Sequence, residues 1–182
     1  MYAPRWWVEG AAVAFQNAWY KENWSSLPFF QGKEWGDVRA NIMSVTDPGF
    51  YKEVRRGIMD APGPKREDCT PNFRMGPYTE RYDTERAPDA DPCQAFMLGV
   101  PYIASLTSYK TVWIDIPQDY YDLGFWGSFK KHVGMNKQEF YDNFNAFLRS
   151  GNPEDEPPEG WAPPEGDIAS YANFLKIVPE SD

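Results

Sequence analysis

Histidine is almost absent from this chain, since His132 is the only one in 182 residues. Cysteine is nearly as scarce, with Cys69 and Cys93 alone. A hydrolytic zinc site needs three protein ligands, an open position for water and a base that activates the water. The sequence has no His-Glu-x-x-His segment, and its two cysteines lack the spacing of zinc ligands. We therefore predict no catalytic residues and no bound cofactor for this chain alone.

Positive charge is also in short supply. The chain has 18 Lys and Arg residues against 27 Asp and Glu residues, which gives a formal net charge of −9. Such a surface repels phosphate backbones, so nucleic acid is not an expected partner. Gly-rich phosphate loops and Gly-x-Ser-x-Gly elbows are missing from the sequence as well. These absences leave no common catalytic pattern in the chain.

No apolar run approaches the length of a membrane span. The first residues also lack the basic region and long apolar run of a signal peptide. We therefore expect a soluble chain without a transmembrane segment. The compartment stays open, because Cys69 and Cys93 could close a disulfide in an exported protein but would remain reduced in the cytoplasm.

Aromatic residues are abundant: 8 Trp, 11 Tyr and 12 Phe make up 17% of the chain. This content and the length suit one domain with a sizeable core. Apolar residues recur mostly at helical spacing, so the predicted fold is mainly α, a single irregular helical domain with long Pro-rich loops. The helical domain is placed at residues 1–150, and a Pro/Glu-rich arm with a short closing helix is placed at 151–182.

Individual helices are predicted from apolar spacing, capping residues and stop signals. Asp47 is expected to cap one helix, and Asn136 with Glu139 forms a capping-box pattern before another. A third, buried helix is expected within Cys93–Lys110, and Pro101 is expected to bend or restart it. Its predicted core residues are Phe96, Leu98, Val100, Ile103 and Leu106. Six prolines and many charges make residues 61–92 an irregular excursion. The predicted helices are Arg5–Glu22, Glu34–Val45, Pro48–Met59, a helix within Cys93–Lys110, Tyr121–Val133, the segment from Asn136 to Gly151, and Ala169–Ile177.

Trp161 lies between two Pro-Pro-Glu-Gly repeats, at 157–160 and 163–166. Proline-rich segments of this kind favour an extended backbone without internal hydrogen bonds. We therefore predict an arm that lies on the protein surface.

Glu9 is the most informative polar residue, because it interrupts the stretch Trp6-Trp7-Val8-Glu9-Gly10-Ala11-Ala12-Val13. A carboxylate is costly to bury unless it is paired, protonated or bound to a metal. Two interpretations stay open. Either Glu9 lies at the helix edge or pairs with an arginine such as Arg5, or it belongs to a site.

The segment Pro4-Arg5-Trp6-Trp7-Val8-Glu9-Gly10-Ala11-Ala12 resembles the Trp-x-x-Glu-Gly-x-Ala signature of the gluzincin, or peptidase MA-like, zinc metallopeptidases. In that family the glutamate of this segment is the third zinc ligand, and Glu9 is the residue that matches it. A second segment looks like the family's closing pattern: Trp126-Gly-Ser-Phe129, then Val133-Gly134-Met135, then Phe140-Tyr141-Asp-Asn-Phe144. The resemblance brackets residues 4–148 and implies the helical C-terminal lobe of a gluzincin, without the His-Glu-x-x-His half.

Three functions remain in view. The leading prediction is a non-catalytic, truncated or accessory relative of gluzincins that binds a peptide or a protein. The alternative is a zinc-dependent peptidase fragment, whose His-Glu-x-x-His comes from upstream sequence or from another chain and whose cofactor is then zinc. A structural or oligomeric protein without a ligand site is the third. The sequence leaves open whether Met1 is the natural start.

A lobe without its other half would leave the helix around Glu9 partly uncovered. We expect either self-association through Trp6, Trp7 and Val13, or coverage of that face by the arm around Trp161. Both outcomes follow from the cost of exposing large apolar side chains to water.

The remaining polar candidates are interpreted as structural. His132 follows two lysines at the end of a predicted helix, where a cation interacts favourably with the helix dipole. A surface capping role is therefore favoured over metal or acid–base chemistry. Three aspartates in a segment interrupted by proline are interpreted as caps and solvated charges: Asp115, Asp119 and Asp122.

Overall fold

The computed structural model describes residues 3–34, 45–60 and 98–164 of the chain. Within these ranges it contains five α-helices and no strand, which confirms the mainly α prediction. No helix in the same ranges is long and apolar enough to cross a lipid bilayer. The helices are α1 (Arg5–Asn23), α3 (Pro48–Asp60), α5 (Gly99–Leu106), α6 (Ile116–Val133) and α7 (Lys137–Arg149).

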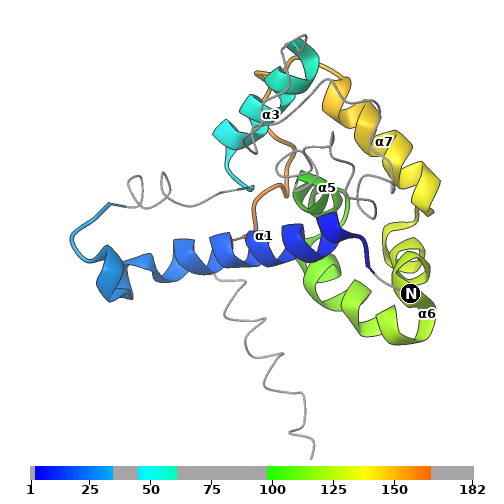
Figure 1. Ribbon diagram of the computed structural model, residues 1–182, viewed down its shortest axis with the longest axis horizontal. Helices are drawn as coiled ribbons and strands as arrows, with labels where there is room; N and C mark the ends of the chain where they lie inside the picture. The colour runs from blue at the N-terminus through cyan, green and yellow to red at the C-terminus, as the bar shows by residue number, and fades with distance from the viewer. Residues whose placement is uncertain (1–2, 35–44, 61–97, 165–182) are drawn as a thin grey trace, which may run out of the picture.

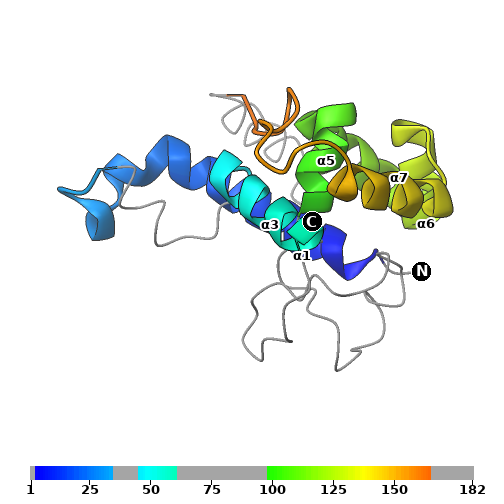
Figure 2. The ribbon, with the colours of Figure 1, turned by 90° about the horizontal axis from the view of Figure 1, so that it is seen from above.

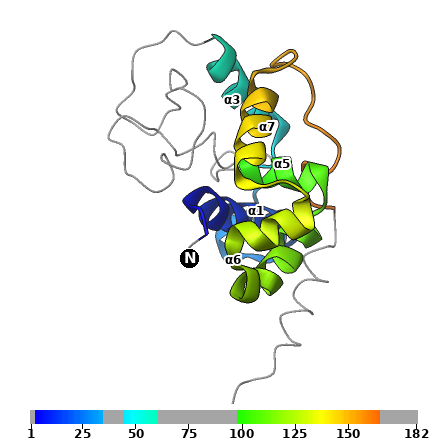
Figure 3. The ribbon, with the colours of Figure 1, turned by 90° about the vertical axis from the view of Figure 1, so that its right-hand side faces the viewer.

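The helices gather around the first half of α1. Figure 1 shows α1 running across the molecule, with α3 alongside α7 on one side and α6 near the first turns of α1. Helix α5 packs against α1 and lies between α1 and α7, as the side view in Figure 3 also shows. The second half of α1 extends beyond the other helices in two perpendicular views (Figures 1 and 2).

Aromatic side chains from distant parts of the sequence build the core. Trp6 of α1 stacks on Phe140 of α7 with the ring centroids 4.7 Å apart, and its Nε1 donates a hydrogen bond to the Tyr141 hydroxyl at 3.2 Å. Phe125 of α6 meets Trp6 edge to face at 6.1 Å. Stacked and edge-to-face pairs stabilise beyond the area that they bury. These contacts hold α1, α6 and α7 together.

The predicted helix caps are confirmed. The Asp47 Oδ1 accepts hydrogen bonds from the backbone amides of Gly49 at 2.8 Å and Phe50 at 3.3 Å, which satisfies two donors that have no partner inside α3. Asn136 and Glu139 form the reciprocal capping box at the start of α7, with N···O distances of 3.1 and 2.7 Å. Local hydrogen bonding thus sets where these two helices begin.

Helix α6 differs from its prediction, because it begins at Ile116 rather than Tyr121. Pro117 lies in the first turn, where its missing amide hydrogen removes no helical bond. Gly124 interrupts the helix with φ 67° and ψ 167°, a backbone conformation that is essentially restricted to glycine. The Ser128 Oγ donates to the Ile116 carbonyl at 2.8 Å across this break. The break turns the second half of α6 toward the core.

Helix α5 confirms part of the prediction for Cys93–Lys110. It begins at Gly99 and has Pro101 in its first turn. Of the two effects predicted for Pro101, the proline therefore lies at a helix start and does not bend a longer helix. Its predicted core residues Val100 and Ile103 are fully buried, whereas Leu106 at its C-terminal end is 52% exposed. The expectation of a buried Leu106 is wrong, because α5 ends at this residue.

Several predictions fall outside the described residues. The helices Glu34–Val45 and Ala169–Ile177 lie mostly or wholly there, as do the excursion at 61–92 and both cysteines.

The predicted surface arm is anchored more deeply than expected. Trp161 is only 2% exposed, with its ring 4.8 Å from Tyr51 of α3 and 5.9 Å from Phe147 of α7. Its carbonyl accepts a hydrogen bond from the buried Tyr109 hydroxyl at 2.6 Å. The arm therefore contributes a tryptophan to the core, because the aromatic ring buries far more area than the flanking prolines.

Arg55 fastens the beginning of the arm to α3. This arginine is 3% exposed, and its guanidinium donates to the carbonyls of Asn152, at 2.9 Å, and of Ser150. Hydrogen bonds between a charged donor and a carbonyl are among the stronger ones in proteins. The turn after α7 is thus held against α3 by one buried side chain.

Candidate functional site

Glu9 lies at the edge of α1. Trp6, Trp7 and Gly10 face the core and are buried, whereas Val8 is 56% exposed. Glu9 is half-buried between these two faces. The helix-edge interpretation fits this placement, because an edge position lets a carboxylate keep part of its contact with water.

Of the three residues predicted to mediate self-association, Trp6 and Trp7 are buried and unavailable, whereas Val13 is half-buried. Trp6 is 1% and Trp7 6% exposed, and both rings pack on Phe125. The side chains of α6 and α7 already cover this face. Residues 151–164, the part of the arm that the structure describes, do not take that role, because Trp161 packs on Tyr51 of α3 and Phe147 of α7.

The two residues that could contribute to a zinc site, Glu9 and His132, belong to different helices, α1 and α6. Among residues 3–34, 45–60 and 98–164, no group of three or more His, Cys, Asp or Glu side chains is arranged to hold a metal ion. Glu9 as a third zinc ligand stays a prediction from family resemblance.

His132 pairs with a carboxylate across the break in α6. Its Nε2 lies 2.6 Å from the Asp119 Oδ2, and the Lys131 amine donates to the same oxygen. The hydrogen bond from Lys131 has the larger effect and that from His132 the next, and together they hold the pKa of Asp119 below its usual value. The pair links the first half of α6 to the second, a structural role that differs from the predicted interaction with the helix dipole.

The three aspartates of this region do not form one site. Asp115 pairs with Lys110 and lies 3.4 Å from the Thr111 hydroxyl. Asp119 faces the second half of α6, and Asp122 is exposed. The interpretation as structural charges fits these separate environments.

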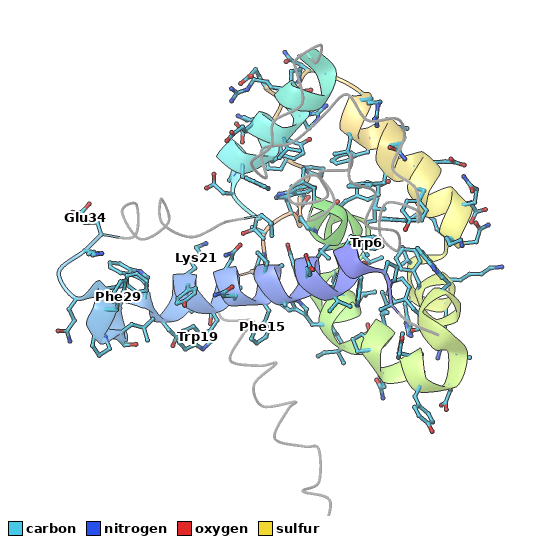
Figure 4. All side chains as sticks on the ribbon, in the orientation of Figure 1. Trp6, Phe15, Trp19, Lys21, Phe29 and Glu34 are labelled. Carbon is cyan, nitrogen blue, oxygen red and sulfur yellow. The ribbon has the colours of Figure 1, made fainter. Side chains whose placement is uncertain are left out.

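A concavity lies elsewhere, between the second half of α1, the start of α3 and the arm. It is a groove of about 480 Å³. Figure 4 shows Lys21 on the side of α1 that faces α3. One wall is made of prolines and Trp161, and the opposite wall carries polar side chains. The lining residues include Asn17, Lys21, Glu22, Asp47, Pro48, Pro157, Pro158, Trp161, Ala162, Pro163 and Pro164.

The walls of this groove are held in place before any ligand binds. The buried Asn17 accepts a hydrogen bond from the Val45 amide at 3.1 Å, which ties α1 to the turn before α3. Asp47 caps α3, and the buried Trp161 anchors the arm. Proline needs no amide partner and has little conformational freedom to lose. A preformed apolar wall opposite polar groups suits an extended peptide.

The sequence did not indicate this groove. Its only signal was the pair of Pro-Pro-Glu-Gly repeats, which favours a stiff arm without indicating what the arm faces. Lys21 and Asn17 look like ordinary polar residues of a helix until α3 and the arm are placed beside them.

No family, curated protein or solved structure was found to match this chain.

Proposed function

We propose that this chain is a non-catalytic, accessory relative of the gluzincin metallopeptidases that binds an extended peptide segment of a partner. The groove between α1, α3 and the arm carries this proposal. The resemblance of residues 4–148 to a gluzincin lobe supports the relation, and the single histidine of the sequence argues against hydrolysis by this chain alone.

A peptide gains affinity in such a groove mainly by covering apolar walls that are already ordered, since fewer groups lose freedom on binding. Lys21 is exposed at the groove and offers a positive charge to a carboxylate of the ligand. Glu22 and Asp47 on the same side disfavour a strongly acidic peptide. The expected ligand is therefore an extended apolar peptide with few charges.

Selection from a phage-displayed library of unstructured peptides tests this function, followed by calorimetric titration of the selected peptide. Ala162→Trp places a large side chain at the groove, because Ala162 is exposed and lines it. We expect this variant to weaken binding at least about tenfold. Ala146→Trp is the matched control, since Ala146 is exposed on α7 and does not line the groove.

Equal binding by both variants would contradict the groove as the site. Failure to select any peptide would favour the third possibility, a structural protein without a ligand site.

The second candidate is a zinc-dependent peptidase fragment whose His-Glu-x-x-His comes from upstream sequence or from another chain. The edge position of Glu9 favours it, because an element laid on the exposed side of α1, next to Val8, would also reach Glu9. Reading the genomic frame upstream of Met1 tests this candidate. An in-frame His-Glu-x-x-His about 20–30 residues before Glu9 would support it.

Metal content separates the two candidates on the purified chain. Elemental analysis after dialysis without chelator should find no stoichiometric zinc, because Glu9 is the only ligand that the resemblance provides. One tightly retained zinc per chain would favour the peptidase candidate.

A further inference from the structure

Helix α1 carries a second apolar stripe on the side opposite its buried face. Val8, Ala12, Phe15 and Trp19 follow one another at intervals of four, three and four residues. Val8 is 56% and Trp19 38% exposed; Ala12 is exposed, and Phe15 is half-buried. Figure 4 shows Phe15 and Trp19 on the side of α1 away from α3 and α7. We call these four residues the outer stripe.

The spacing of the outer stripe is that of a coiled-coil seam. Alternating steps of three and four residues keep side chains on one narrow face of a helix, where they interlock with a second helix. A surface helix normally has polar residues opposite its buried face. An exposed seam on a helix that is already packed on its other side indicates a further helix as its partner.

Phe15 is held in place for such an interface. Its ring meets Trp113 edge to face at 5.3 Å, and the Trp113 Nε1 donates to the Ala11 carbonyl at 3.2 Å. The Phe15 ring is thus fixed beside α1, and little freedom is lost when a partner covers it.

The outer stripe matches itself in the antiparallel direction. A twofold axis between residues 13 and 14 would place Ala12 of one copy opposite Phe15 of the other, and Val8 opposite Trp19. Each pair joins a smaller side chain with a larger one, as interlocking helices require. A parallel pairing would instead set Trp19 on Trp19 and Ala12 on Ala12, leaving a clash at one level and a gap at another.

The shape of the molecule leaves room for this arrangement. Helix α1 has 19 residues, so it is about 28 Å long at 1.5 Å per residue. Its second half, which carries Trp19, extends beyond the other helices (Figures 1 and 2). A second copy can therefore approach that half without meeting α3, α5, α6 or α7 of the first, whereas α6 lies near the first turns of α1.

We propose that the outer stripe is the interface of a twofold homodimer in which the α1 helices of two copies pack antiparallel. One helix pair covers less than the roughly 800 Å² per partner of a standard stable interface, so the dimer is weak and concentration-dependent. Each copy has a formal net charge of −9, so the two copies repel one another. Added salt screens this repulsion and strengthens the dimer, whereas it would weaken docking of a basic partner.

Sedimentation equilibrium of the full chain from about 1 µM to about 1 mM measures the association. We expect Val8→Glu and Trp19→Lys each to raise the dimer dissociation constant at least about tenfold, because each leaves an unpaired charge in the seam. The double variant should return it to within about threefold of the parent, because the introduced carboxylate of one copy then faces the introduced amine of the other. Within one copy these positions are too far apart to pair.

Leu106→Glu is the matched control. Leu106 is 52% exposed, close to the 56% of Val8, and this change adds the same negative charge on α5 and not within the outer stripe. Its dissociation constant should stay within about twofold of the parent. A monomer at every concentration, an unchanged constant in Val8→Glu, or no recovery in the double variant would each overturn the proposal. None of these results bears on peptide binding in the groove, which lies on the other side of α1.

Discussion

The two halves of α1 contain similar residues but have different surroundings. Trp6 in the first turn is 1% exposed, whereas Trp19 near the C-terminal end is 38% exposed. Trp6 meets rings from α6 and α7, which are distant in the sequence, while Trp19 packs on the adjacent Tyr20 at 5.5 Å. The difference shows that the partners available in space, and not the residue type, decide whether an aromatic side chain becomes core.

Beyond Trp19, the chain forms its own small aromatic cluster. Phe29 is 79% exposed and Phe30 8%, and their rings meet edge to face at 5.1 Å. The Lys33 amine lies 5.2 and 5.8 Å from the two ring centroids, within the range of cation–π attraction. Local contacts alone thus cover only part of this aromatic surface, in contrast to the core around Trp6.

The strongest test of this comparison is to truncate one tryptophan in each half. Trp6→Ala should lower the free energy of unfolding by about 3–5 kcal/mol, because it leaves a cavity between α6 and α7 and removes the hydrogen bond to Tyr141. Trp19→Ala should cost less than about 1 kcal/mol. Denaturant unfolding below the concentration at which copies associate measures both. Equal losses would show that the second half of α1 is as well packed as the first.

The anchored arm offers the next largest effect. Arg55→Met should destabilise by about 2–3 kcal/mol, because the carbonyls of Ser150 and Asn152 lose their buried donor. Arg56→Met is the control, since Arg56 is half-exposed in its pair with Glu154. Surface pairs of this kind contribute less than about 1 kcal/mol. Similar unfolding midpoints for the two variants would mean that Arg55 does not fasten the arm.

Because Tyr109 and Tyr102 are buried, we expect the free energy of unfolding to fall in alkali. Burial raises the pKa of Tyr109 above its ordinary value, and the same cause raises that of Tyr102. Below about pH 10 the unfolded tyrosine stays protonated, so the contribution of each buried tyrosine to the free energy of unfolding is fully present. Above that pH the unfolded state ionises first, and stability falls by up to about 1.4 kcal/mol per pH unit for each tyrosine.

Urea unfolding of the parent and of Tyr109→Phe between about pH 9 and pH 11 measures this slope. The variant should lose about 1 kcal/mol at neutral pH, because its hydrogen bond to the Trp161 carbonyl is gone. Its stability should then fall less steeply in alkali. Parallel slopes would contradict the assignment to Tyr109.

Glu9 lies between the buried and the exposed face of α1, and we expect its substitution to change the free energy of unfolding least. Glu9→Gln removes a half-buried charge while keeping the shape of the side chain. We expect the free energy of unfolding to stay unchanged or to rise by up to about 1 kcal/mol at neutral pH, because less charge has to be desolvated. A loss above roughly 2 kcal/mol in denaturant melts would indicate a paired carboxylate with a structural role, and the remnant-ligand interpretation would lose its main support.

Features decided within one helical turn could be predicted from the sequence. Asp47 caps α3, Asn136 with Glu139 opens α7, and α1 begins right after Pro4, as these residue types predict. The prediction failed at α6, where Pro117 looked like an interruption but lies in a first turn. Gly124 carries the real break, and a glycine within a helical pattern does not by itself indicate one.

The sequence by itself determined the helical class, the starts of α1, α3 and α7 and the shortage of zinc ligands, because each depends on residue types or on neighbours within about four positions. Only the tertiary structure decided that Trp6 and Trp161 are buried while Trp19 is not, that Glu9 lies at an edge, and that prolines face Lys21 across a groove. The hydrogen bond between Trp6 and Tyr141 joins residues 135 positions apart. Burial depends on contacts between residues that are far apart in the sequence, and a local sequence pattern does not specify such contacts.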